Sequence, residues 1–303
     1  VINDLEIVSE QLLNISNPFF NIKDVYNNFP FGQYDVFTIN NKAVVIGDIA
    51  NTDISKYIYS YNNVSKTWEN QSLINDNGSA HFFSYTNSFV YSENTNLMYG
   101  LKSNGYTQNF IQFDIDTGNV SLLTPHPEQT NYYFGKGFSY QQKIYYTMQS
   151  TNDLWAYDIN NENWEVVATL PYDITQSRNS YITPVVVGNY VYITNGSENV
   201  EVNDFWRMNL NNYQWEQLTD NPNSSKNASV YQLNNQLHFV SNEVWIYDLS
   251  NQSWEIMPKS KITAASNNFG VDAFIQNNIP YVIYREDFSN ISYLNLFIGD
   301  LVN

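Results

Sequence analysis

The chain has 303 residues, of which 43% are hydrophobic and 14% charged, so it is long and apolar enough to bury a sizeable core. Its formal net charge of −17 would repel a phosphate backbone, which argues against nucleic acid and anionic membranes as partners. The chain has no cysteine, and this excludes disulfides, thiol nucleophiles and cysteine-ligated zinc. Because no run of 18 apolar residues occurs, we expect no membrane insertion.

Asparagine is abundant and lysine scarce, a composition typical of extracellular proteins. The first residue, Val1, is not preceded by a methionine or an apolar leader, which fits a processed secreted chain and equally a trimmed one. We therefore expect an extracellular or cell-surface location, with the cytoplasm as the alternative. N-x-Ser/Thr motifs supply glycosylation candidates, among them Asn14, Asn63, Asn70, Asn77, Asn119, Asn251 and Asn290.

In chain order, five segments repeat one pattern. An anchor residue is followed seven positions later by Trp or Val, and another apolar residue stands two positions before the anchor. The anchors are Tyr61, Phe113, Tyr157, Met208 and Tyr247, and their partners are Trp68, Val120, Trp164, Trp215 and Trp254. Successive anchors lie 52, 44, 51 and 39 residues apart, as expected for repeats with loop insertions between constant units.

Each copy predicts a β-hairpin. Apolar residues two apart share one face of a strand, the Asp or Asn after the anchor supplies turn chemistry, and the Trp opens the return strand. Upstream of the hairpins lie apolar, β-rich runs at residues 43–47, 97–101, 144–148, 190–194, 237–240 and 281–284. A further strand is expected before each run. Four strands recurring about every 45 residues predict the blade of a propeller.

The Tyr-Asp…Trp pattern, as in Tyr157-Asp158…Trp164, resembles Kelch repeats over nearly the whole chain. It departs from them in the glycine doublet of the second strand, which is reduced here to Gly47-Asp48, Asn195-Gly196 or nothing. The resemblance implies a propeller that binds a partner. Kelch-like copper radical oxidases need a cysteine that this chain lacks, whereas others isomerise sialic acid with polar residues in the channel mouth, as Arg178 and Lys136 would permit.

The predicted fold is all-β, one domain over residues 1–303. It is a six-bladed propeller of four-stranded antiparallel blades. A sixth anchor, that of the last blade, is expected near Leu296, within residues 293–297, and its partner seven positions later would be residue 303, where the sequence stops. Leu5-Glu6-Ile7 resembles Trp254-Glu255-Ile256, so an N-terminal strand at about residues 5–8 is expected to complete that blade.

All seven tryptophans occupy the two repeat positions, so we interpret them as packing between blades. The turns joining strands one to two and three to four share one face of the ring, and they are short and rich in Asn. The other face holds the mouth of the central channel. Residues entering the innermost strands there are the candidate ligand-binding set: Gln33, His81, Lys136, Arg178, Lys226 and Asn268. An acidic rim is expected around this basic mouth, and the two together would suit a small anionic or polyhydroxylated ligand. The rim residues are Asp48, Asp53, Asp153, Glu198, Glu201, Asp204, Glu243, Glu286 and Asp287. The alternative is that these cations pair with loop carboxylates.

Catalytic and metal signatures are weak. The three histidines lie far apart in the sequence, and we expect His238 to be a core residue of a second strand. Asp114-Ile-Asp116-Thr-Gly118 resembles a Ca²⁺ loop but coincides with the repeated hairpin turn, so turn chemistry is favoured. Glu198, Glu201 and Asp204 form a candidate cation site. No cofactor is predicted beyond a possible Ca²⁺.

The leading hypothesis is a non-catalytic recognition module that binds a protein or glycan with the mouth face. One alternative is a secreted enzyme acting on a sugar acid or glycan, with Arg178 holding a carboxylate. Another is a structural subunit of a surface assembly or virion, which would self-associate.

Overall fold

The computed structural model describes residues 31–49, 56–62, 64–65, 67–73, 89–103, 108–128, 134–148, 151–171, 184–194, 203–222, 229–241, 243–257, 271–285 and 294–298. Every regular element in these ranges is a β-strand. The same ranges contain no helix able to cross a membrane.

The strands form antiparallel sheets in chain order, numbered here 1 to 6. Sheet 1 contains β1 (Phe31–Ile39), β2 (Lys42–Ile49), β3 (Lys56–Asn62) and β4 (Thr67–Leu73). Sheet 2 contains β5 (Phe89–Ser92), β6 (Leu97–Ser103), β7 (Gln108–Phe113) and β8 (Val120–Leu123). Sheet 3 contains β9 (Phe134–Tyr140), β10 (Lys143–Met148), β11 (Asp153–Asp158) and β12 (Asn163–Thr169).

The second half of the chain continues the series. Sheet 4 contains β13 (Val185–Val187), β14 (Tyr190–Thr194), β15 (Phe205–Asn209) and β16 (Gln214–Gln217). Sheet 5 contains β17 (Ser229–Leu233), β18 (Gln236–Val240), β19 (Val244–Asp248) and β20 (Ser253–Ile256). Sheet 6 contains β21 (Val271–Gln276), β22 (Ile279–Arg285) and β23 (Leu294–Ile298).

The prediction of six four-stranded blades is wrong. Among the described residues the structure has five four-stranded blades, sheets 1 to 5, and sheet 6 consists of three strands in the order β21-β22-β23. The expected closing strand at residues 5–8 lies outside the described residues. Its prediction depended on a three-residue similarity, and so short a match does not determine a strand pairing.

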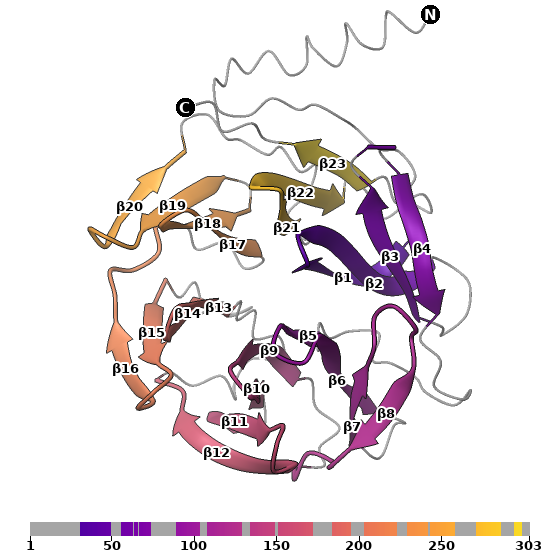
Figure 1. The fold of residues 1–303 in the computed structure, drawn as a ribbon. Coiled ribbons are helices and arrows are strands. Elements are labelled where there is room, and N and C mark those ends of the chain that lie inside the picture. The colour runs from indigo at the N-terminus through magenta and orange to yellow at the C-terminus, as the bar shows by residue number, and fades with distance from the viewer. Residues whose placement is uncertain are drawn as a thin grey trace, which may run out of the picture.

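The sheets are arranged around a common centre, with the first strand of each sheet innermost (Figure 1). Aromatic and aliphatic side chains fill the space between neighbouring sheets. For example, Tyr61 of sheet 1 packs against Phe274 and Tyr281 of sheet 6. Strand alternation allows one strand to serve two such contacts: Tyr145 faces sheet 4, whereas Tyr146 faces sheet 2.

Hydroxyl groups also tie innermost strands together. The Thr38 hydroxyl of β1 donates to the Ile275 carbonyl of β21 (2.9 Å) and accepts from the Ile275 N–H (3.2 Å). The Ser139 hydroxyl of β9 donates to the Tyr91 carbonyl of β5 (2.7 Å). These bonds satisfy backbone groups at strand edges that no sheet pairing reaches.

Three tryptophans of the fourth strands join consecutive sheets in the same way. The indole N–H of Trp164 donates to the Thr124 carbonyl (3.0 Å), that of Trp215 to Thr169 (2.9 Å) and that of Trp254 to Thr219 (2.8 Å). Each acceptor belongs to the end of the preceding sheet. The interpretation of these tryptophans as packing between blades is confirmed.

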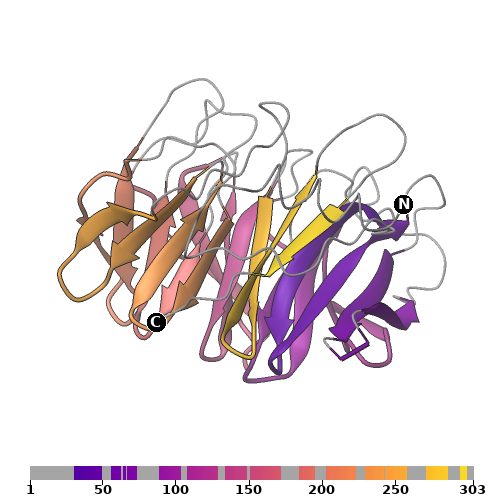
Figure 2. The ribbon, with the colours of Figure 1, turned by 90° about the horizontal axis from the view of Figure 1, so that it is seen from above.

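The hairpin turns gather on one face of the ring (Figure 2). Asn40 and Asn41 join β1 to β2 with φ of 49° and 61°, and Asn277 and Asn278 join β21 to β22 with φ of 54° and 60°. Two consecutive residues with positive φ define the type I′ hairpin turn, which asparagine tolerates. The Asn-rich turns therefore have a structural role, as expected.

Candidate functional site

The mouth of the central channel was predicted at the starts of the innermost strands, and the fold allows two of its six residues to be placed. Gln33 and Lys136 are each the third residue of an innermost strand, β1 and β9 respectively. Because the β1–β2 turn lies at the other end of β1, Gln33 is on the face opposite the hairpin turns, and the same holds for Lys136. His81, Arg178, Lys226 and Asn268 lie outside the described residues.

The two placed residues share a backbone irregularity. In β1, Phe31 pairs with Ile49 and Tyr34 with Gly47, so Gly32 and Gln33 together oppose one residue of β2. In β9, Phe134 pairs with Met148 and Gly137 with Tyr146, so Gly135 and Lys136 likewise oppose one residue of β10. Both arrangements are β-bulges. A bulge bends its strand and redirects side chains, and such bulges are frequent beside binding sites.

Three carboxylates of the acidic rim occupy equivalent positions on consecutive sheets. Asp153, Asp204 and Glu243 each stand two residues before a third-strand tryptophan, at the strand end opposite the hairpin turns. All three are half-buried. The Trp245 indole N–H donates to the Glu243 carboxylate (3.3 Å), which orients that side chain.

The predicted cation site is not assembled by the described residues. Asp204 is described, but Glu198 and Glu201 lie outside the described ranges. Within those ranges no group of three or more His, Cys, Asp or Glu side chains is close enough to hold a metal ion.

The alternative Ca²⁺ loop at Asp114 is a hairpin turn, as predicted. The Asp114 carboxylate accepts the N–H groups of Asp116 and Thr117 (both 2.9 Å), and its carbonyl accepts the N–H of Gly118 (2.8 Å). These backbone hydrogen bonds, led by that from Thr117, lower the pKa of Asp114. The same turn recurs at Asp158, whose carboxylate accepts from two following N–H groups.

Of the glycosylation candidates, Asn70, Asn119 and Asn251 are described, and all three side chains are exposed. Asn14, Asn63, Asn77 and Asn290 lie outside the described residues.

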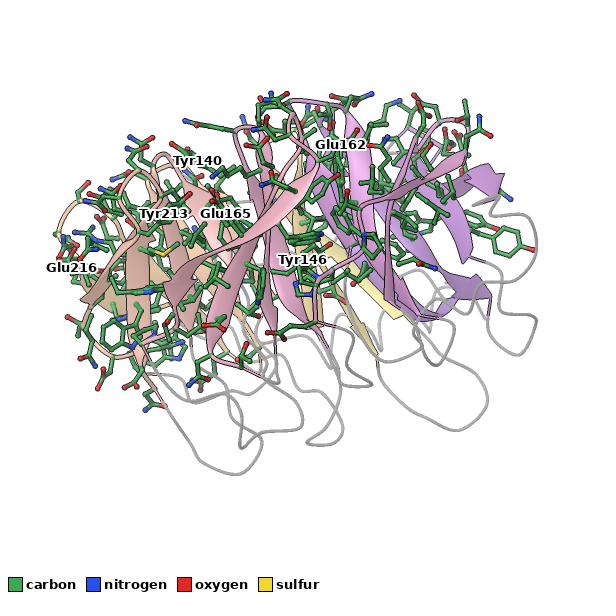
Figure 3. The ribbon with its side chains drawn as sticks, turned by 90° about the horizontal axis from the view of Figure 1, so that it is seen from below. Tyr140, Tyr146, Glu162, Glu165, Tyr213 and Glu216 are labelled. Atoms are coloured by element: carbon green, nitrogen blue, oxygen red, sulfur yellow. The ribbon has the colours of Figure 1, made fainter. Side chains whose placement is uncertain are left out.

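A polar cluster that the sequence analysis did not identify joins sheets 3 and 4 near the hairpin turns. The Lys143 ammonium donates to the Glu165 carboxylate (2.6 Å) and contacts the Tyr213 hydroxyl (3.5 Å), which lies 3.4 Å from the Tyr145 hydroxyl. Figure 3 shows Glu165 and Tyr213 together on this side of the ring, with Tyr140 nearby. Burial is the largest single influence on Lys143 and lowers its pKa, but the hydrogen bonds and charge interactions with Glu165 and Tyr213 together outweigh burial and raise the pKa of the lysine.

Sheet 4 carries a related pair. The Arg207 guanidinium donates to the Glu216 carboxylate through two nitrogens (both 2.7 Å) and lies over the Tyr190 ring, 4.8 Å from its centroid. Glu165 and Glu216 each follow a fourth-strand tryptophan directly. Because side chains alternate along a strand, the Trp faces one neighbouring sheet and the Glu lies on the opposite face of its own sheet. There the Glu pairs with a Lys or Arg of the same sheet.

The described histidines belong to the packing between sheets. His126 is 1% exposed and its ring lies 4.6 Å from that of Trp164 and 5.0 Å from that of Trp155. His238 is also 1% exposed, which confirms its prediction as a core residue. Burial lowers the pKa of each to about 4, so both rings are neutral at neutral pH.

Comparisons with known proteins agree with this architecture. No family profile matches the chain. Kelch domain-containing protein 10 of Homo sapiens and that of Bos taurus are each 28% identical over 149 residues, which is 47% of this chain and 32% of the relative. The chain thus matches about a third of the length of these relatives. The solved structure titled "Structure of YjhT" superposes with a TM-score of 0.64 over 93% of this chain and 97% of that one, at 11% identity, a likeness of fold alone.

Proposed function

Because the chain folds as a β-propeller and is similar to a Kelch domain-containing protein over about half of its length, we propose that it is a recognition module whose channel-mouth face binds a protein partner. Kelch propellers are associated with protein binding. That association does not say which face of the ring binds, and we assign binding to the mouth face. The recognition is non-catalytic in this proposal, and Gln33 and Lys136 contact the partner.

The observation that carries the choice of face is the pair of matched bulges. They occur at the same point of β1 and β9 and contain Gln33 and Lys136. A bulge interrupts ladder hydrogen bonds, so its presence at two equivalent mouth positions favours a binding role over a stabilising one. The opposite face carries short turns whose backbone groups bond within the turn or to the adjoining turn of the same sheet. Such turns leave few backbone groups free for a partner.

Charge suggests what the partner presents. The mouth residues of the prediction are enriched in cations, whereas the rim around them carries Asp153, Asp204 and Glu243. A partner with a protruding acidic or carbonyl-rich loop, surrounded by basic residues, would complement both zones.

The test is affinity capture with charge-matched variants. Lys136→Glu changes the mouth, and Lys42→Glu makes the same change at an exposed lysine beside the β1–β2 turn. A partner that wild type and Lys42→Glu capture from the native proteome, and that Lys136→Glu loses by tenfold or more, supports the proposal. Loss in Lys42→Glu with retention in Lys136→Glu contradicts it. If the chain binds purified glycans and captures no protein, the ligand is a carbohydrate and the proposal of a protein partner is wrong.

We further propose an extracellular location for this activity. The support is compositional, together with the exposure of Asn70, Asn119 and Asn251. Intact-mass analysis of the protein from its native source should show N-glycans on these residues. An unglycosylated protein in the cytosolic fraction would contradict the proposal.

A further inference from the structure

The contact between sheet 5 and sheet 6, named here the 5–6 seam, is packed differently from its neighbour. Its buried core comes from sheet 5, and sheet 6 adds the half-buried Ala273 and Ile275. The seam between sheets 4 and 5 instead packs Phe205 edge-on against Tyr247 (4.8 Å) and Trp254 (5.1 Å). No tryptophan takes part in the described packing of the 5–6 seam.

A histidine lies in this seam on a tyrosine. Tyr231 of β17 and His238 of β18 are paired directly across the two strands, and their rings are parallel at 8° with centroids 4.8 Å apart. Tyr231 is 6% exposed and His238 1%. Tyr231, Val240 and Ile246 all face Ala273 and Ile275, so strand alternation places His238 on the same side.

The polar atoms of this pair have no hydrogen bonds. Neither ring nitrogen of His238 has a partner, and neither does the hydroxyl of Tyr231. A buried polar group without a partner costs about 1–3 kcal/mol, so three of them on two stacked rings are unusual in a seam that needs only packing. The stack is compatible with a neutral imidazole. It has no acceptor for the second N–H that protonation would create.

The surroundings of His238 offer no compensating charge. Tyr231 is the titratable group that contacts it from β17, Ile246 stands opposite on β19, and Ala273 and Ile275 face it from β21. Asp272 is next to Ala273 on β21, so alternation turns it to the other face of that strand. Burial raises the pKa of Tyr231, so no phenolate forms to balance an imidazolium. These statements hold for the described side chains.

We propose that the 5–6 seam is an acid-sensitive joint of the ring, at which protonation of His238 separates β17 and β18 from β21. Protonation adds a buried charge and a second N–H donor without a partner, so both N–H groups of the imidazolium are unmet in a seam with little aromatic packing. The ring then opens at this seam in preference to those that carry tryptophans. Since innermost strands form the channel, opening here changes the mouth.

Two backbone N–H groups of β21 report on this opening separately. The Ala273 N–H donates to the Ser229 hydroxyl across the 5–6 seam (2.8 Å). The Ile275 N–H, two residues further along the same strand, donates to the Thr38 hydroxyl of sheet 1 and so crosses the contact between sheets 6 and 1 (3.2 Å). Residue-resolved hydrogen exchange between pH 7 and pH 4.5, corrected for the intrinsic rate, therefore compares the joint with a matched control in one strand.

The proposal predicts that protection at Ala273 falls about tenfold per pH unit below pH 6.5, while protection at Ile275 changes much less. His238→Phe keeps an aromatic ring on Tyr231 but cannot be protonated, so it should remove the pH dependence at Ala273. His238→Gln is a second non-titratable variant for the case that the first does not fold. His126→Phe, which removes the other buried histidine, should leave the response of Ala273 intact. Equal loss at Ala273 and Ile275 overturns the proposal, and so does an unchanged response in the His238 variants.

Discussion

At the residue scale, the repeated Trp-Glu dipeptide has two separate functions. In Trp164-Glu165 the indole bonds to the Thr124 carbonyl of the preceding sheet, while the carboxylate accepts from Lys143. Trp215-Glu216 does the same with Thr169 and Arg207. One dipeptide thus fixes a sheet against its neighbour and neutralises a cation of its own sheet.

The indole hydrogen bond can be measured by comparing two tryptophans of one packing cluster. Trp164 donates to Thr124, whereas the buried Trp155 Nε1 has no hydrogen-bond partner. Trp164→Phe should lower the free energy of unfolding by about 1 kcal/mol more than Trp155→Phe, because only the first leaves a carbonyl unpaired. Urea unfolding of both variants checks this. Equal losses would show that the hydrogen bond contributes nothing beyond packing.

Individual residues differ in how far the sequence predicts them. The tryptophans and His238 were correctly predicted to be packing residues from their positions in the repeat. The Lys143–Glu165 and Arg207–Glu216 pairs were missed, because they join residues of different strands and depend on a register that the sequence pattern does not fix. The stack of His238 on Tyr231 was missed for the same reason.

At the scale of elements, the turn after each anchor is closed by an Asp or Asn side chain. Asp114, Asp158 and Asp248 each accept two backbone N–H groups from the turn they begin. The turn residues were therefore predictable, since short polar side chains that bond the backbone two residues later favour turns.

Replacing Asp114 tests this turn. Asp114→Ala removes the acceptor of two N–H groups and should lower the free energy of unfolding by about 1 kcal/mol. Asp114→Asn retains an acceptor oxygen and should lose less than half of that. Thermal or urea unfolding with and without Ca²⁺ measures both. A Ca²⁺-dependent stability that only the wild type shows would instead support a cation loop.

Gly137 of β9 lies where sheets 2 and 3 meet, and it has no room for a side chain. A Cβ there would lie 2.6 Å from side-chain carbons of Tyr146 and Val90 and 2.7 Å from the Tyr145 carbonyl. Gly137→Ala should therefore destabilise the protein by about 3 kcal/mol, at the upper end of overpacking effects. Gly188 has φ of 58° and open space around it, so Gly188→Ala should cost about 1 kcal/mol. A smaller loss for Gly137→Ala than for Gly188→Ala would contradict this packing.

At the scale of the whole molecule, the repeat predicted the series of sheets well, and it failed at the end of the chain. Sheets 1 to 5 have the four strands expected from the five anchor copies. Sheet 6 has three strands in the part of the chain that the structure describes, and the sequence there contains no anchor with a Trp partner. The mouth residues were predicted as entering the innermost strands. Gln33 and Lys136 do lie there, but the bulges around them have no sequence signature that we identified.

Acid should destabilise the whole ring through its buried histidines. The pKa values of His126 and His238 are about 4 in the folded protein, below the ordinary value near 6.5, so the unfolded chain binds more protons between these values. The free energy of unfolding therefore decreases as pH falls from 6.5 to 4, by about 3 kcal/mol for each histidine. Urea unfolding at pH 7, 5.5 and 4.5 measures the slope. A His126→Phe, His238→Phe double variant that keeps the same slope would contradict this assignment.

The central claim is that recognition occurs at the mouth face and that the hairpin face maintains the ring. Hydrogen exchange of the chain alone and bound to its captured partner tests this most directly. The claim predicts new protection at residues 31–34 and 134–137, the bulged ends of β1 and β9, with the hairpin turns at Asn40–Asn41 and Asn277–Asn278 unchanged. Protection confined to the hairpin turns would contradict it.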